Sequence, residues 1–168
     1  MEALIIDDSP KNGYLTEDFL LNSGFFGTCV FRHTSKIKEA KELIQGRLFH
    51  FIIIDPAFSG ASGLSLIKMI KDYSPSTKII ALSLCSIKPC ASECWQQCLD
   101  LGADCHLDKV KTFDLLPETV RRYLSSALEG ASKYKKAVSA KTFPSILRGE
   151  FSGNARLKTP SFLRAKGR

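Results

Sequence analysis

Acidic and basic side chains stand directly after three short runs of strand type that lie far apart in this 168-residue chain. They are Asp7 and Asp8 after the first run, Asp55 after the second and Lys109 after the third. In an open parallel α/β sheet, ligands bind outside the carboxyl ends of the strands, so these side chains are expected to converge there. Clustered carboxylates repel one another unless a hard cation lies among them, and Mg²⁺ together with substrate phosphate oxygens meets that demand. The chemistry indicated is phosphoryl transfer.

The elements that must position these residues alternate regularly. Between residues 2 and 127, runs of β type alternate with segments of helical period, which predicts five βα units around a parallel sheet. The predicted strands are 2–7, 28–31, 49–55, 78–83 and 105–108, and the predicted helices lie at 11–22, 35–46, after 63, within 89–101 and at 113–127. We expect Leu15, Phe19 and Leu20 on the buried face of the first helix. Gly102 is expected to end the fourth helix in a left-handed conformation, and Pro117 to lie near the start of the fifth.

Charge is distributed unevenly along the chain. Residues 1–128 carry 14 Lys and Arg against 15 Asp and Glu, whereas residues 129–168 carry 10 against 2. The overall net charge of +7 is therefore local. The second segment also lacks apolar periodicity and is rich in Lys, Arg, Ser, Gly and Pro, which is typical of a flexible segment. We predict one domain over residues 1–128 and a basic, flexible C-terminal tail over residues 129–168.

The sequence contains no candidate transmembrane segment or signal peptide. No apolar run approaches the roughly 20 residues that span a bilayer, and Met1 leads directly into the first predicted strand. A cytoplasmic location is expected, where the six cysteines stay reduced.

Three cysteines, Cys90, Cys94 and Cys98, recur every fourth residue, and Cys85 and Cys105 lie nearby in the sequence. On one helix Cys90 and Cys98 would be about 12 Å apart, too far for a single Zn²⁺ with Zn–S bonds of about 2.3 Å. A site made of Cys94, Cys98 and Cys105 stays open as an alternative. The favoured interpretation is that these thiols are small apolar groups on a buried helix face.

Over residues 2–127, the sequence resembles the receiver domain of two-component response regulators, the CheY-like family. The resemblance rests on a constellation: Asp7-Asp8, Asp55 with Gly63 eight residues later, Ser83 ending the fourth strand, Gly102-Ala103, and Lys109. It implies a doubly wound α/β fold with a five-stranded parallel sheet in the order 2-1-3-4-5. Taken singly, each motif also has an ordinary explanation, such as a turn after Asp8, a strand-end hydroxyl at Ser83 or a surface charge at Lys109.

The resemblance also implies roles for the acidic residues. Asp55 is expected to be the phosphoacceptor, whose carboxylate takes a phosphoryl group from a phosphohistidine. The expected ligands of Mg²⁺ are Asp8 directly, Asp7 largely through water, Asp55, and the backbone carbonyl of Ala57. The implied partners are a histidine kinase or a histidine phosphotransfer protein.

The same resemblance implies a phosphoryl-binding and switch group. Lys109 is expected to offset charge on the phosphoryl oxygens, and Ser83 to donate a hydrogen bond to one of them. His106 stands where the family generally has an aromatic residue that moves inward with the strand-four hydroxyl. Here an imidazole would make that movement, and its state would depend on pH. The alternative is a passive strand histidine.

Two positions, each directly after a predicted site residue, depart from the family. Leu84 stands where a small residue usually follows the strand-four hydroxyl, and a bulky side chain there is expected to slow phosphorylation by small-molecule donors unless it turns outward. Val110 replaces the proline that usually follows the lysine, often after a cis bond. Because a non-proline cis bond costs about 3 kcal/mol, the bond before Val110 is predicted to be trans and the lysine loop to differ in shape.

Two functions follow. The first is a single-domain response regulator that is phosphorylated on Asp55 and signals by protein contact, a phosphoacceptor and not an enzyme in the turnover sense. The second is a receiver-like binding module that acts through its basic tail on nucleic acid, an anionic membrane surface or a protein partner. The tail contains a near-repeat, residues 141–148 and 158–164, which is a candidate docking motif. Its candidate contact residues are Lys141, Arg148, Lys158 and Arg164.

Overall fold

The computed structural model describes residues 1–58, 62–84 and 94–125 of the chain. Its strands are β1 (Glu2–Ile6), β2 (Val30–Thr34), β3 (Phe51–Ile54), β4 (Lys78–Ser83) and β5 (Cys105–Asp108). Its helices are α1 (Pro10–Leu20), α2 (Ile37–Gly46), α3 (Ser62–Tyr73), α4 (Cys94–Asp100) and a further helix over 116–125, with a π-turn η1 (Leu21–Phe25) and a 3-10 turn η2 (Phe113–Leu115). The predicted tail, its repeat, Cys85 and Cys90 lie outside the described residues.

All five strands run parallel in the order β2-β1-β3-β4-β5, which confirms the predicted fold and strand order. Strand β1 lies between β2 and β3, and its Ile6 pairs with Thr34 of β2 on one side and with Ile54 of β3 on the other. At the far side of the sheet, Ser83 of β4 pairs with Asp108 of β5. Because every strand points the same way, all five carboxyl ends meet at one edge of the sheet.

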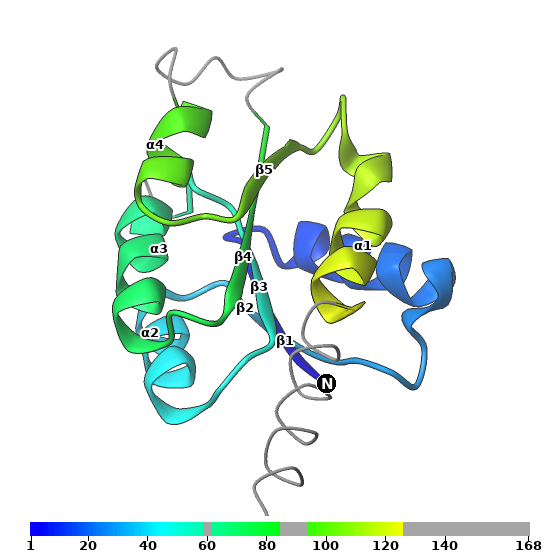
Figure 1. Cartoon of the computed structure of the whole chain (residues 1–168), viewed down its shortest axis with the longest axis horizontal. Helices are drawn as coiled ribbons and strands as arrows, with labels where there is room; N and C mark the ends of the chain where they lie inside the picture. The colour runs from blue at the N-terminus through cyan, green and yellow to red at the C-terminus, as the bar shows by residue number, and fades with distance from the viewer. Residues whose placement is uncertain (59–61, 85–93, 126–168) are drawn as a thin grey trace, which may run out of the picture.

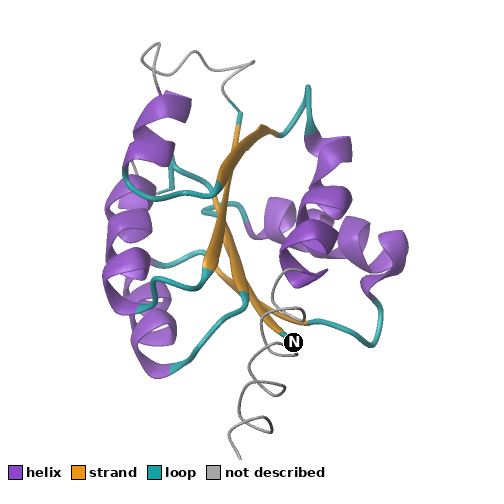
Figure 2. Cartoon of the chain, viewed as in Figure 1, coloured by secondary structure: helices purple, strands orange, loops and turns teal. Residues whose placement is uncertain are grey.

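The sheet separates two layers of helices (Figure 2), and an apolar cluster lies on each of its faces. Helices α2, α3 and α4 cover one face, and α1 together with the helix over 116–125 covers the other (Figure 1). Successive strand residues point to opposite faces, so Leu4 and Ile6 pack under the first layer and Ala3 and Ile5 under the second. Both faces are buried, which explains why the central strands read as continuous apolar runs such as 51–54.

Some boundaries differ from the sequence prediction. Strand β2 begins at Val30 and continues to Thr34, beyond the predicted end at residue 31. On α1, Leu20 is buried as expected, but Leu15 is 54% exposed because Gly13 and Thr16 face the sheet instead. Gly102 follows α4 with φ +105°, as predicted for a left-handed helix end. Pro117 is the second residue of the last helix, where its missing N–H costs no helical hydrogen bond.

No helix in the described ranges is both long enough and apolar enough to cross a bilayer.

Candidate functional site

Asp7, Asp55 and Lys109 each lie just past the end of a strand, and the backbone N–H of each still donates a hydrogen bond to the neighbouring strand. The N–H of Asp7 donates to the carbonyl of Thr34 at 3.2 Å, and the N–H of Asp55 donates to that of Ile6 at 2.9 Å. The N–H of Lys109 donates to the carbonyl of Ser83 at 2.7 Å. These bonds place all three residues at the carboxyl edge of the sheet, where their side chains leave the strands.

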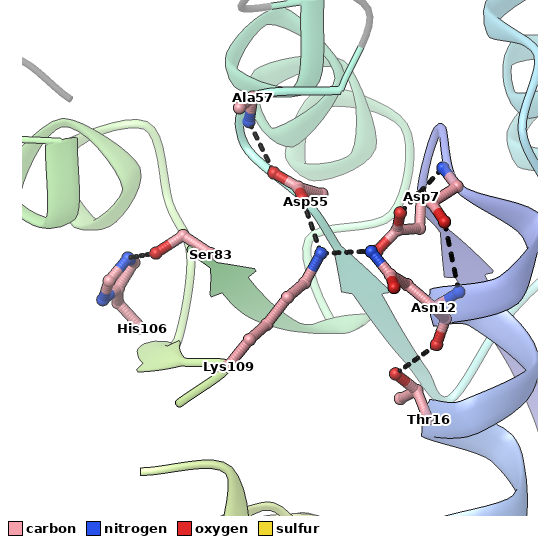
Figure 3. Close-up of polar contacts among 9 residues, drawn as sticks. Asp7, Asn12, Thr16, Asp55, Ala57, Ser83, His106 and Lys109 are labelled. Carbon is pink, nitrogen blue, oxygen red and sulfur yellow. Dashed lines mark hydrogen bonds and ion pairs between the residues drawn. The ribbon is translucent and has the colours of Figure 1, made fainter. Parts of the chain in front are cut away.

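The structure brings the three side chains into direct contact. The ammonium group of Lys109 lies 2.5 Å from Oδ2 of Asp7 and 2.6 Å from Oδ2 of Asp55 (Figure 3). The side chains of Lys109, Asp7 and Asp55 are only 9%, 5% and 10% exposed. A lysine therefore bridges two buried carboxylates that are separated by 48 residues in the sequence.

Local turns fix the remaining oxygen of each carboxylate. Oδ1 of Asp7 accepts the backbone N–H of Ser9 at 2.9 Å, and Ser9 in turn caps α1 through the N–H of Asn12. Oδ1 of Asp55 accepts the N–H of Ala57 at 2.8 Å. Ala57 therefore lies beside the site, in the turn that follows β3, and the role of its carbonyl as a metal ligand stays a prediction.

The site carries more negative than positive charge. Burial by itself would lower the pKa of Lys109, but its hydrogen bonds with Asp55 and Asp7 outweigh burial and raise that pKa, so the amine is charged at neutral pH. Asp8 is exposed, and it offers a carboxylate oxygen within 4.8 Å of oxygens of both Asp7 and Asp55. Three carboxylates around one ammonium leave two negative charges in excess.

This donor set fits a hard divalent cation. All three side chains offer oxygen ligands only, and Mg²⁺ prefers oxygen ligands, usually from a few carboxylates together with waters or phosphate oxygens. Within the described ranges this is the single group of three acidic, His or Cys side chains close enough to share a metal ion. Asp7, Asp8 and Asp55 are the residues that could hold it.

Gly63 supports the site through the space that it leaves empty. A Cβ atom at this position would lie 2.2 Å from the carbonyl oxygen of Asp55 and 2.8 Å from backbone atoms of Pro56. A side chain here would collide with backbone, which cannot rotate away as a flexible side chain can. Gly63 was part of the predicted constellation. The structure supplies the reason, because the start of α3 packs closely against the backbone of Asp55 and Pro56.

Ser83 and His106 form a separate pair beside the carboxylates. Oγ of Ser83 lies 2.9 Å from Nε2 of His106, and Figure 3 shows the hydroxyl directed toward the imidazole and away from Asp55. Burial lowers the pKa of His106, although the charge of Asp108 opposes this shift. The two residues that were predicted to act together are thus in contact, but the structure does not place the Ser83 hydroxyl on the carboxylate group.

The residues on either side of Lys109 include two, Asp108 and Thr112, whose roles the sequence did not predict. Asp108 accepts hydrogen bonds from the N–H groups of Val110 and Lys111, and Thr112 closes the loop back onto Asp108. An Asp at a strand end with a Thr four residues later is a turn signal that could have been recognised. No cis peptide bond occurs in the described part of the chain, so the bond before Val110 is trans, as predicted. Leu84 is half-buried, and its effect on access to Asp55 stays a prediction.

The described cysteines lie on different sides of the sheet. Cys94 and Cys98 pack with the layer that includes α2 and α3, whereas Cys105 packs with the opposite layer. Burial raises the pKa of the Cys105 thiol. Because a sheet separates them, Cys94, Cys98 and Cys105 do not converge on one metal, and the open alternative of a site made from these three is wrong.

Comparisons with known proteins agree with this geometry. The family model described as the response regulator receiver domain matches residues 3–121. The receiver domain of a DNA-binding response regulator (merR) from Colwellia psychrerythraea 34H is 20% identical, with a TM-score of 0.64, over 74% of this chain and 98% of that chain. A CheY-like receiver domain protein from Methanospirillum hungatei JF-1 is 19% identical, with a TM-score of 0.65, over 77% and 97% of the two chains.

The response regulator TrrA from Thermotoga maritima, solved in complex with Mg²⁺ and BeF, is 24% identical, with a TM-score of 0.56, over 73% of this chain and 97% of that chain. A search of proteins with curated functions found no match. At these identities the solved structures establish the fold alone. The assignment to a family rests on the receiver-domain family model, which matches most of the chain. With that match and a parallel sheet of the order 2-1-3-4-5, the chain belongs to the response regulator receiver domain family.

Proposed function

We propose that this protein is a response regulator that accepts a phosphoryl group on Asp55 from a phosphohistidine and signals through contacts with other proteins. The donor would be a histidine kinase or a histidine phosphotransfer protein. The observation that carries the proposal is the contact of Lys109 with both Asp7 and Asp55 inside a group of three carboxylates. The arrangement provides a nucleophile, a cation and a set of metal ligands within one small volume.

Asp55 is the carboxylate best suited to be the nucleophile. It is buried and directly follows β3, the central strand of the sheet. Its Oδ1 accepts the N–H of Ala57, and its Oδ2 accepts a hydrogen bond from Lys109. Its backbone is fixed by Ile6 and by the close approach of Gly63. Such fixed placement favours in-line attack, because orientation is a large part of the barrier in phosphoryl transfer.

In the proposed step, a carboxylate oxygen of Asp55 forms a bond to phosphorus while the phosphorus–nitrogen bond of the phosphohistidine breaks. The electron pair of that bond stays on the imidazole nitrogen of the donor, and the product on this chain is an aspartyl phosphate. Mg²⁺ held by Asp7, Asp8, Asp55 and the carbonyl of Ala57 would neutralise charge on the phosphoryl oxygens. Lys109 keeps its positive charge and donates a hydrogen bond to one of those oxygens.

Asp55 is consumed when it accepts the phosphoryl group and is restored when water hydrolyses the aspartyl phosphate. The protein is therefore proposed to act as a phosphoacceptor, with its own site promoting both reactions, and not as a turnover enzyme. Ser83 and His106 would report the phosphorylated state, because the hydroxyl can hydrogen-bond either His106, as it does here, or a phosphoryl oxygen.

The direct test is the intact mass of the full chain after incubation with Mg²⁺ and a phosphorylated phosphotransfer protein. We expect a gain of one phosphoryl group that is absent from Asp55→Asn and unchanged in Asp72→Asn, an exposed aspartate on α3. A parallel reaction with phosphoramidate separates chemistry from docking of the protein donor. An unmodified wild-type protein with both donors, or equal modification of the Asp55→Asn variant, would contradict the proposal.

The charge distribution supports a second proposal, that residues 129–168 form a basic tail distinct from the receiver over 1–128. Their excess of Lys and Arg would bind nucleic acid or an anionic membrane, with affinity that falls as salt rises. Full-length protein in which the four candidate contact residues are replaced by Glu should lose that binding and keep phosphorylation of Asp55. Binding that survives the replacements would contradict the tail's role.

A further inference from the structure

The loop that follows β5 is closed by its own hydrogen bonds. Lys109 is the first residue after the strand. It lies within a turn formed by residues 108–112, which we call the β5 turn. Oδ1 of Asp108 accepts the N–H of Val110 at 2.8 Å and the N–H of Lys111 at 3.0 Å. The loop therefore wraps around one carboxylate oxygen.

Thr112 closes the β5 turn from the other end. Its hydroxyl oxygen accepts the N–H of Asp108 at 2.8 Å, and its own N–H donates to the carbonyl of Asp108 at 3.1 Å. These bonds and those accepted by Oδ1 of Asp108 span the segment that carries Lys109. Every one of them uses an atom of Asp108 or Thr112.

Both ends of the β5 turn are anchored on the parts of the fold that form the site. At its start, the N–H of Lys109 donates to the carbonyl of Ser83 in β4. At its end, the ring of Phe113 stacks on Phe19 of α1, with ring centroids 4.7 Å apart and an interplanar angle of 26°. Helix α1 begins at Pro10, two residues after Asp8, so the turn and the carboxylates of Asp7 and Asp8 are supported by the same helix.

Packing does not account for the shape of the turn itself. Val110 is 57% exposed and Lys111 is exposed, so neither side chain buries the loop. Val110 also has an N–H group that a proline would lack, and that N–H is one of the two that Asp108 binds. Hydrogen bonds to Asp108 thus restrain the backbone here, as the ring of a proline at position 110 would otherwise do.

We propose that Asp108 and Thr112 are positioning residues that hold Lys109 against Asp7 and Asp55. The proposal rests on the proposed function for its effect on phosphoryl transfer, but the placement of Lys109 can be measured without it. A lysine side chain has several free rotations, so its amine reaches two buried carboxylates reproducibly only if its backbone is fixed. Displacing a catalytic group by about 1 Å can cost up to about 100-fold in rate.

The first measurement is the reactivity of Lys109 toward an amine-acylating reagent, followed by peptide mapping of the full chain. Lys109 is 9% exposed and Lys111 is exposed, so Lys111 serves as the internal reference. We expect acylation of Lys109 relative to Lys111 to rise about tenfold in Asp108→Ala and Thr112→Val, because the amine leaves the carboxylates more often. Asp108→Asn keeps an Oδ1 acceptor and should stay within about twofold of wild type.

The second measurement is the rate constant for phosphorylation by phosphoramidate, together with Mg²⁺ affinity by calorimetry. Asp108→Ala should lower the rate constant about tenfold, or about 1.4 kcal/mol, without lowering Mg²⁺ affinity, because the metal ligands lie in other loops and a displaced ammonium group competes less for their oxygens. Asp108→Asn should restore most of the rate. A loss of Mg²⁺ affinity that parallels the loss of rate would show general damage to the site and would overturn the proposal.

The two measurements separate the possible failures. If wild-type protein is not phosphorylated, the proposed function fails, and the acylation result alone decides whether the turn positions Lys109. If wild-type protein is phosphorylated but Asp108→Ala matches it in both rate and acylation, the positioning role is wrong. If Asp108→Asn behaves like Asp108→Ala, the charge of Asp108 acts rather than its hydrogen-bond acceptor, and the proposal is again overturned.

Discussion

Two clusters of charged side chains lie at opposite ends of the sheet and have opposite composition. At the carboxyl end, Asp7, Asp8 and Asp55 surround one lysine, Lys109. At the amino end, in what we call the lysine cluster, Lys71 and Lys78 surround one aspartate, Asp104, which directly precedes β5. Aspartate is thus in excess at the carboxyl end, by three to one, and lysine at the amino end, by two to one.

In the lysine cluster two ammonium groups hold a single carboxylate, so no negative charge is left over. Oδ2 of Asp104 is 2.8 Å from Lys71 and accepts the N–H of Ile79 at 2.9 Å, while Oδ1 is 2.7 Å from Lys78. Burial by itself would raise the pKa of Asp104, but these hydrogen bonds outweigh it and lower the pKa. The carboxylate site keeps an excess of negative charge instead. The comparison teaches that one cluster surrounds its single carboxylate with positive charge, whereas the other keeps an excess of negative charge that a divalent cation would balance, and it is the second that we propose to be reactive.

The largest expected effect is that of removing the charge of Lys109. Lys109→Met keeps much of the side-chain volume but removes the cation that would contact the phosphoryl oxygens. We expect the phosphorylation rate constant to fall about 100-fold or more, as for loss of one stabilising donor at a transition state. Stopped reactions with phosphoramidate, read by intact mass, measure this change. Lys111→Met, on an exposed neighbour, is the control, and equal rates for the two variants would contradict the role of Lys109.

The second effect concerns the free energy of unfolding in the presence of metal. Mg²⁺ at 100 times its Kd should stabilise the wild-type protein by about 2.7 kcal/mol, because only the folded state brings the three carboxylates together. Asp7→Asn should lose most of that increment, whereas Asp104→Asn should keep it. Urea titrations with Mg²⁺ and with EDTA provide the comparison. A metal increment that depends on Asp104 would remove the distinction between the two clusters.

The third effect is the cost of breaking the lysine cluster. Asp104→Ala removes the carboxylate from two lysines and from the N–H of Ile79, although Lys71 still donates to the carbonyl of Thr77. We expect a loss of about 2 kcal/mol of unfolding free energy, less than for a fully buried pair because Lys78 is partly exposed. Asp72→Ala, which breaks an exposed pair with Lys68 on α3, should cost only about 0.3 kcal/mol. Chemical denaturation of both variants tests this. Phosphorylation at saturating donor should be unaffected in each.

The pH dependence of stability should show the same cluster. The pKa of Asp104 is lower in the folded protein than in the unfolded chain, where an Asp titrates near about 3.9. Its contribution is therefore fully present above that unfolded value and is lost as the pH falls through the lower folded value. The difference in urea midpoint between wild type and Asp104→Asn should be constant near neutral pH and shrink below about pH 4. A difference that grows on acidification would refute this assignment.

The smallest expected effect is at Leu84, the residue after β4. If its half-buried side chain restricts access to Asp55, Leu84→Ala should speed phosphorylation by acetyl phosphate roughly threefold, which corresponds to less than about 1 kcal/mol. Leu48→Ala, at a 78% exposed position near the opposite end of the sheet, is the matched control. A Leu84→Ala rate no higher than that of the parent would count against crowding by this side chain.

Much of the fold could be predicted because the central strands are buried on both faces and appear as apolar runs. Strand β2 was placed less well, since it lies at the edge of the sheet and its half-buried residues include Arg32 and His33. The expected burial of Leu15 was wrong for a different reason. Several faces of α1 offer apolar residues, and the contact of Gly13 with the ring of His33 selects the face that meets the sheet.

The candidate site was predictable as a set of residues but not as a set of bonds. Asp7, Asp55 and Lys109 were recognisable because they follow strands whose ends meet. That Ser83 contacts His106 instead of the carboxylates, and that Asp108 closes a turn through Thr112, depends on rotamers and backbone angles. Sequence spacing alone does not specify either of these.

The sequence by itself determined which chemical groups stand at the ends of the strands, and hence the kind of reaction that they can support. Only the tertiary structure decided how they pair: Lys109 with both Asp7 and Asp55, and Asp104 with two lysines at the other edge. The physical reason is that residue identity is local, whereas the distance between two charges depends on strand order, register and turn shape. Those are settled by packing across the whole sheet.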